Sequence, residues 1–294
     1  PRVNAFKAFL QQPASFPFSI NAFYRNKKGW FKPPLGALMP NMKDFDAIVV
    51  GGGPGGSVAA RKLGEKGARV LLLDKASFPR EKVCGDGISG KSIRILRELG
   101  LSEKVEEKPH LKIKGLVVSG PDGTVLDVKI PPREGKEKYG YCARREVFDN
   151  VLFEHATRVC EFREKMQVVG LLKEMRKGKE FIAGVRAIDL STKQAREYTC
   201  NIVLGADGVT SAVAQHLNAN ELPPEHLCIA VRGYYSNVKG LSDKIEIHFV
   251  DDFLPGYFWI FPLENGACNV GLGMVAKEMQ SKKLNLVEGL KKIL

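Results

Sequence analysis

A glycine-rich turn between a predicted strand and a predicted helix holds the residues best suited to bind a phosphate. Gly51, Gly53 and Gly56 form a G-x-G-x-x-G pattern directly after the apolar run 45–50. The first glycine permits a tight turn, the second lets the backbone approach a pyrophosphate, and the third lets helix and strand pack closely. Asp74 ends the next predicted strand, where a carboxylate accepts hydrogen bonds from ribose hydroxyls. The pattern predicts a dinucleotide site, for either a flavin or a nicotinamide dinucleotide.

Cysteine chemistry is the second candidate. The six cysteines are scattered and include no Cys-x-x-Cys pair, so we predict neither a metal site nor a disulfide framework, and a reducing compartment. Cys84 stands apart because Gly85 and Gly87 flank it and would let the backbone lie against a flat ring system. A buried, unreactive thiol is the other interpretation of Cys84.

The elements around the glycine turn predict an α/β fold. A strand at 45–50, a helix at 55–66 and a strand at 68–73 make a β-α-β unit with a parallel sheet. Helices are also expected at 89–98 and 145–158. The remaining expected elements are a hairpin over 111–130 with its turn at 120–123, and strands near 166–175, 181–189, 197–204, 245–250, 257–262 and 267–275.

Charge and aromatic residues concentrate at the start of the chain. The net charge is +12, and the residues before Asp44 include seven basic, eight aromatic and no acidic side chains. Aromatic rings beside lysines suit a membrane interface, so residues 1–43 predict contact with a membrane surface; an extension packed on the protein body, or the end of a targeting segment, is the alternative. No run of about 18 apolar residues occurs. We predict a cytoplasmic protein, and peripheral association with the inner membrane face stays open. Nucleic-acid binding is not expected, because no stacking platform accompanies the basic residues.

Two downstream segments resemble motifs of one flavoprotein group. Asp207 and Gly208 follow an apolar strand and resemble the Asp-Gly motif of the group that includes para-hydroxybenzoate hydroxylase and the geranylgeranyl reductases. The resemblance implies that Asp207 contacts the ribityl and pyrophosphate region of FAD. Arg145 begins an R-x-x-F-D segment whose arginine sits beside the cofactor in that group. Ala214 stands where the group often has arginine, which fits the reductases better than the NADPH-using hydroxylases.

The loop after Asp74 also resembles the reductases of that group. Cys84, Gly85 and Asp86 belong to a Cys-Gly-Asp-Gly segment similar to that of the bacterial geranylgeranyl reductase family. The resemblance implies that these residues contact the flavin, with Cys84 near its reactive face.

A long aromatic segment carries the most specific resemblance. Tyr257, Trp259, Phe261, Pro262 and Gly271 fit the Y-x-W-x-F-P-x-x-x-G-x-x-N-V-G-x-G pattern of the geranylgeranyl reductase family at every fixed position. The resemblance implies two strands that bound a lipid pocket facing the flavin. A tunnel for a polyprenyl chain needs large apolar walls with few polar groups, as this segment provides. An aromatic-rich core hairpin is the alternative.

The resemblance covers residues 44–294 and implies a Rossmann-like FAD-binding domain with an antiparallel-sheet substrate domain. We expect the FAD-binding domain at 44–110 and 140–215, the substrate domain at 111–139 and 216–294, and a separate extension at 1–43. The family carries a third, Gly-Asp-Ala-like flavin motif that we do not find in this sequence. The expectation is therefore a chain truncated at its C-terminus.

These patterns predict an FAD-dependent oxidoreductase that reduces carbon–carbon double bonds of a geranylgeranyl or other polyprenyl lipid. The expected catalytic residues are Cys84, Tyr257 and Trp259, with Cys84 or Tyr257 as proton donor. NADPH, ferredoxin and a quinol all remain open as the electron donor. One alternative is a flavin monooxygenase or halogenase of the same fold, although Tyr257 and Phe261 differ from the W-x-W-x-I-P segment of the halogenases. The other is a non-catalytic, membrane-associated scaffold, which the missing third motif would fit.

Overall fold

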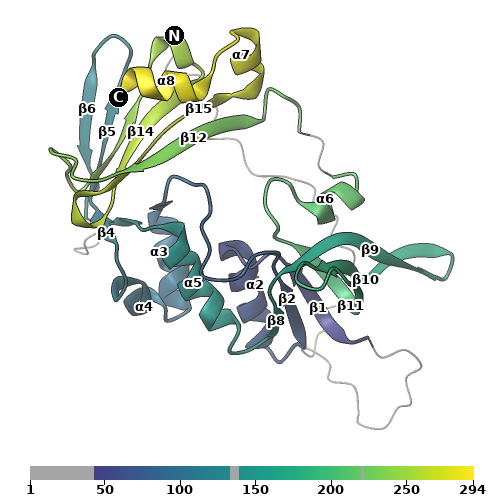
Figure 1. Cartoon of the computed structure of the whole chain (residues 1–294). Helices are drawn as coiled ribbons and strands as arrows, with labels where there is room; N and C mark the ends of the chain where they lie inside the picture. The colour runs from purple at the N-terminus through teal and green to yellow at the C-terminus, as the bar shows by residue number, and fades with distance from the viewer. Residues whose placement is uncertain (1–42, 133–138, 220–221) are drawn as a thin grey trace. The chain divides into compact units, whose positions relative to one another are not determined.

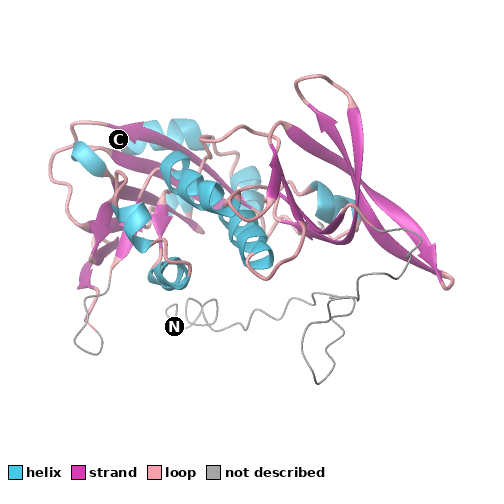
Figure 2. Cartoon of the chain, turned by 90° about the horizontal axis from the view of Figure 1, so that it is seen from below, coloured by secondary structure: helices cyan, strands magenta, loops and turns pink. Residues whose placement is uncertain are grey.

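A computed structural model describes residues 43–132, 139–219 and 222–294 of the chain. The predicted membrane-interface segment 1–43 lies outside these residues except for Lys43, and its role stays a prediction. Helices and strands both contribute extensively to the described chain (Figure 2). The predicted α/β class is confirmed. In the described ranges, no helix is both long enough and apolar enough to cross a membrane.

The first sheet holds the glycine turn and has six strands in the order β8-β2-β1-β11-β10-β9 (Figure 1). Strands β8, β2, β1 and β11 are parallel, whereas β10 and β9 run antiparallel in a meander. Ile48, Val49 and Leu71 are completely buried, as expected for parallel strands covered on both faces. The strands are β1 (Phe45–Val50), β2 (Val70–Leu73), β8 (Glu161–Arg163), β9 (Met166–Arg176), β10 (Lys179–Asp189) and β11 (Ala195–Gly205).

Two helices pack beside these strands and beside each other, α2 (Pro54–Gly64) and α5 (Arg145–Ala156). Three shorter helices, α3 (Gly90–Glu98), α4 (Ser102–Glu106) and α6 (Ala212–His216), complete this part of the fold. Leu152 of α5 and Leu96 of α3 belong to one apolar core. The helices predicted at 55–66, 89–98 and 145–158 are confirmed, with each end within two residues of its predicted position.

The second sheet has six strands in the order β12-β15-β14-β13-β5-β6. All neighbours are antiparallel except β5 and β13, which pair in parallel. Helices α7 (Ala276–Ser281) and α8 (Leu286–Ile293) follow the last strand, and Leu286 and Leu290 pack against one face of the sheet. The strands are β5 (Gly115–Ser119), β6 (Val125–Lys129), β12 (Cys228–Tyr235), β13 (Lys244–His248), β14 (Gly256–Pro262) and β15 (Cys268–Val275).

The hairpin predicted over 111–130 is wrong in one respect. Residues 115–129 form the β5–β6 hairpin, but β4 (Leu111–Ile113) belongs to a separate three-stranded sheet with β7 (Gly140–Cys142) and β3 (Gly87–Ile88). The chain changes sheets at Lys114, whose backbone N–H donates to the carbonyl of Asp243. The apolar pattern of 111–119 is continuous across this change, so it gives no sign of the break.

Candidate functional site

The glycine turn after β1 is too crowded for larger residues. Gly51 has φ +101°, and a Cβ there would lie 2.4 Å from the Ala206 carbonyl oxygen. A Cβ at Gly56 would lie 1.7 Å from the Gly51 carbonyl oxygen. The turn, α2 and the segment after β11 therefore meet at a spacing that only glycine allows.

Helix α2 begins at this turn without a side-chain cap. Gly53 is the N-cap residue and makes no side-chain hydrogen bond. A Cβ at Gly55 would meet nothing within 4 Å, so space lies beside the first turn of the helix. Unpaired N–H groups and the positive end of the helix dipole favour an anion at such a position. These features fit the pyrophosphate of a dinucleotide.

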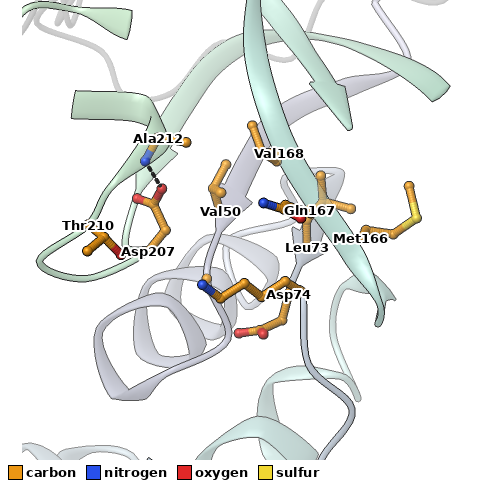
Figure 3. A pocket seen from close by; sticks show the side chains of 11 residues that line it. Val50, Leu73, Asp74, Met166, Gln167, Val168, Asp207, Thr210 and Ala212 are labelled. Atoms are coloured by element: carbon orange, nitrogen blue, oxygen red, sulfur yellow. Dashed lines mark hydrogen bonds between the residues drawn. The ribbon is translucent and has the colours of Figure 1, made fainter. Parts of the chain in front are cut away.

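Two carboxylates flank the turn, the buried Asp74 and the half-buried Asp207. Asp74 accepts hydrogen bonds from the backbone N–H groups of Gly52 at 2.6 Å and Ala76 at 2.8 Å, and its remaining lone pairs are free to accept from a ribose. Asp207 accepts from the Ser211 hydroxyl at 2.5 Å and from the Ala212 N–H at 2.7 Å, and Gly208 follows with φ +84°. Figure 3 shows Asp74 and Asp207 lining one pocket at the carboxyl ends of β1 and β2, where ligands bind to open α/β sheets.

Arg145 does not point freely into this pocket. Its guanidinium donates to both oxygens of the fully buried Asp149, at 2.6 and 2.7 Å. Although burial lowers the pKa of Arg145, the hydrogen bond to Asp149 raises it above its ordinary value, so the guanidinium stays charged. Arg80 also approaches Asp149, with Nη1 at 3.0 Å from Oδ2, and its Nη2 lies 3.3 Å from a Cβ position at Gly53. Two cations thus share one buried carboxylate beside the start of α2.

Sequence reasoning missed Arg80. The signal that could have found it is a basic residue in the loop that leaves the second strand of a dinucleotide unit. Its Nη1 is buried and lacks a hydrogen bond of good geometry, so an additional acceptor at the start of α2 would satisfy it.

Replacing Asp149 by asparagine is expected to lower the free energy of unfolding by about 3 kcal/mol or more, because two largely buried guanidinium groups lose their shared anion. Urea denaturation checks this. The matched control is Glu98→Gln, which breaks the exposed Arg94–Glu98 pair and should change the free energy of unfolding by less than about 0.5 kcal/mol. Equal effects of the two substitutions would contradict the assignment of Asp149 as the shared anion.

The Cys84 loop lies against the aromatic strand β14. A Cβ at Gly85 or Gly87 would lie 3.1 or 2.8 Å from the Phe261 ring, and the Gly85 position is 3.6 Å from Trp259 Nε1. Asp86 has φ +64° and is fully buried. Its carboxylate accepts from the Arg145 N–H at 3.1 Å, so it faces the protein interior and any contact with a cofactor would fall to the loop backbone.

Three other cysteines have thiols whose pKa values are raised by burial. Burial raises the pKa of Cys160 and of Cys200 to about 11. Burial, followed by the charge of Asp86, raises the pKa of Cys142 above its usual range. These three thiols stay protonated near neutral pH. Cys84 is half-buried, and the next residue, Gly85, lies against Trp259 and Phe261 of the aromatic strand. Among the described residues, no group of three or more His, Cys, Asp or Glu side chains could hold a metal ion.

Tyr257, Trp259 and Phe261 share one face of β14, with ring centroids 6.0 and 6.3 Å apart along the strand. Gly271 pairs with Trp259 across the strands, and a Cβ there would lie 2.1 Å from Trp259 Cζ2. Trp259 is 7% exposed and Tyr257 is 42% exposed. The structure therefore brings the loop after Cys84 against Trp259 and Phe261 and leaves Tyr257 further along the strand, beside Phe249. Pro262 ends the strand as a buried residue.

The chain matches two family models. The FAD binding domain model matches residues 44–238, and the geranylgeranyl reductase catalytic domain model matches residues 227–292. The two matches overlap at β12 and together extend over both large sheets.

Two curated relatives are similar over most of this chain. Menaquinone reductase of Mycobacterium tuberculosis (strain ATCC 25618 / H37Rv) is 32% identical over 82% of this chain and 58% of the relative. Digeranylgeranylglycerophospholipid reductase of Methanosarcina mazei is 31% identical over 81% of this chain and 56% of the relative. The chain thus spans less than two thirds of the length of these relatives.

Solved structures share the fold. A geranylgeranyl bacteriochlorophyll reductase-like protein of Thermoplasma acidophilum superposes with a TM-score of 0.71 at 25% identity, covering 85% of this chain and 61% of that protein. The FAD-dependent chondrochloren halogenase of a myxobacterium also has a TM-score of 0.71, at 24% identity over 85% of this chain and 57% of the halogenase. The second likeness concerns the fold alone.

Proposed function

Because the chain belongs to the geranylgeranyl reductase family of FAD-binding proteins, we propose that it reduces carbon–carbon double bonds of a polyprenyl lipid with FAD as its cofactor. The observation that carries this proposal is the packing of the Cys84 loop against Trp259 and Phe261. It joins one end of a dinucleotide site to an aromatic, largely apolar strand face.

The residues present fit FAD. The uncapped start of α2, Arg80 and the turn at Gly51, Gly53 and Gly56 would hold the pyrophosphate, and Asp74 would accept from the ribose. Asp207 and Gly208 would lie by the ribityl chain, and the backbone of Cys84 and Gly85 would lie against the ring system. Bound FAD, once reduced, supplies a hydride. We also propose the domain division predicted from the sequence, with an FAD-binding domain at 44–110 and 140–215 and a substrate domain at 111–139 and 216–294.

The substrate would lie on the aromatic face of the second sheet. Tyr257, Trp259, Phe261, Pro262 and Gly271 would form its wall near the flavin. Across the strand pairs, Trp259 is aligned with Ile247, then Val118, then Leu126, so an apolar surface continues to the edge of the sheet. Such a surface suits a long hydrocarbon chain and excludes water from the reacting bond.

Cys84 is the better candidate of the two predicted proton donors. It lies in the loop that contacts Trp259 and Phe261, and its thiol interacts with the Arg145 guanidinium. Tyr257 is 42% exposed, so bulk water competes for the same proton transfer. Cys84 would therefore hold the proton next to the bond that the apolar face positions.

The test is an anaerobic reaction of the purified, FAD-loaded protein with geranylgeranyl lipids and with menaquinone in detergent. NADPH, reduced ferredoxin, a quinol and dithionite are compared as reductants. A mass gain of about two per reduced bond in H2O, and of about three or four in D2O, is the expected result. Oxygen or chlorine in the product under air would establish the monooxygenase or halogenase alternative. A folded protein that takes up no FAD would establish the scaffold alternative.

A further inference from the structure

A fully buried asparagine on β15 joins the Cys84 loop to the aromatic strand. Asn269 is 0% exposed. Its Nδ2 donates to the Cys84 carbonyl oxygen and to Asp86 Oδ2, both at 2.7 Å. Its Oδ1 accepts from Trp259 Nε1 at 3.0 Å. One side chain therefore connects three elements, all of which line the proposed site.

The loop needs such a partner. Residues 84–86 lie outside the strands and helices, and their backbone is held at one end, where the Asp86 carbonyl oxygen accepts from the Ala143 N–H at 3.1 Å. Asp86 adopts a left-handed conformation that non-glycine residues rarely adopt. Without Asn269, Asp86 Oδ2 and the Cys84 carbonyl would lose a donor inside the protein, where an unpaired polar group is costly. The amide supplies both donors and one acceptor, which leucine, aspartate and serine cannot do together.

We propose that Asn269 is a positioning residue, which fixes the Cys84 backbone and the Trp259 indole relative to each other. This inference rests on the proposed function, because it concerns the same site. Asn269 itself is enclosed by the loop, Asp86 and Trp259, so it acts through them and does not touch the substrate.

The groups around Asp86 define what a charged substitution would do. Tyr234 on β12 donates a hydrogen bond to Asp86, Cys142 on β7 feels its charge, and Arg144 before α5 supplies a cation that is itself paired with Glu264. In Asn269→Asp, a second carboxylate would face Asp86 Oδ2. Two carboxylates at hydrogen-bond distance share one proton and repel each other once it is lost. The loop should therefore be held at low pH and released at high pH.

The first readout is thiol labelling of the FAD-loaded protein. The Cys84 ratio is the labelling rate at Cys84 divided by the labelling rate at the exposed Cys228. At about pH 8, Asn269→Asp should raise this ratio about tenfold over wild type, and at about pH 5.5 the ratio should return to within about threefold. Asn269→Ser, which adds no charge, should raise the ratio at both pH values. With an active lipid substrate, the kcat of each Asn269 variant should fall about tenfold, while its KM changes less.

The matched control is Val270→Ala, which opens a cavity on the opposite face of the same strand. It should lower stability and leave the Cys84 ratio within about twofold of wild type. A pH-independent ratio in Asn269→Asp, an unchanged ratio in Asn269→Ser, or an equal rise in Val270→Ala would overturn the inference. Wild type that reduces no lipid yet shows the expected labelling would defeat the proposed function and leave the role of Asn269 intact.

Discussion

Substituting Gly56 with alanine is expected to abolish FAD binding. The added methyl would lie 1.7 Å from the Gly51 carbonyl oxygen, so α2 and the turn would have to separate by more than an ångström. That movement displaces both the phosphate-facing backbone and the start of the helix. We expect the affinity for FAD to fall by at least about 100-fold and the free energy of unfolding to fall by about 1–3 kcal/mol. Flavin titration of the apoprotein, followed by fluorescence, measures the affinity.

Gly55→Ala is the matched control for that substitution. It adds the same methyl to the adjacent residue of the same helix, where nothing lies within 4 Å. Alanine is also more favourable than glycine inside a helix, by about 1 kcal/mol. This variant should fold at least as well as wild type, so it is the control for the loss of stability. It is not a control for FAD affinity, because its methyl enters the space proposed for the pyrophosphate. Gly56→Ala protein that purifies with a full complement of FAD would refute the proposed packing of the turn.

The parallel part of the fold was predictable because its sequence signals are local. Residues 45–50 and 68–73 are nearly continuous apolar runs, and the glycine turn and helix between them leave one arrangement. Strand β12 was not predicted. Arg232 interrupts the apolar alternation of Cys228–Tyr235, and only the structure shows that this side chain lies against Glu81 and the Tyr234 ring. Strand prediction assumes that charged side chains face the solvent, and Arg232 does not follow that assumption.

The site was predictable where backbone geometry restricts the residue type, and not where distant side chains meet. The glycines at positions 51 and 56 follow from the turn itself. The contact of Asn269 with Asp86, in contrast, joins residues 183 positions apart. Asp86 is expected at the cofactor, and that contact stays a prediction; its carboxylate accepts from Asn269 and from the Arg145 N–H. Nothing in the local sequence states which way that side chain turns.

Alanine at Gly271 is expected to remove most lipid reduction while sparing FAD binding. A Cβ there would lie 2.1 Å from Trp259 Cζ2, so the indole must move by about 1 Å or more. A shift of that size at a positioning surface can lower the rate by about 100-fold. The affinity for FAD should stay within a few-fold of wild type, because the glycine turn lies in the other sheet. The readouts are kcat/KM and flavin titration.

Tryptophan fluorescence separates this displacement from general unfolding. The chain has two tryptophans, so a Trp30→Phe background reports Trp259 alone, and its emission should shift to longer wavelength as the indole leaves its buried position and its bond to Asn269. The matched control is Gly273→Ala on the same strand, whose Cβ would lie 3.1 Å from the Ala230 methyl and away from Trp259. That variant should lose less than about tenfold in kcat/KM, because its contact is longer than the one at Gly271 and a shift of a few tenths of an ångström between β15 and β12 relieves it. If Gly271→Ala kept both the emission and kcat/KM of wild type, Trp259 would not be the wall that positions the lipid.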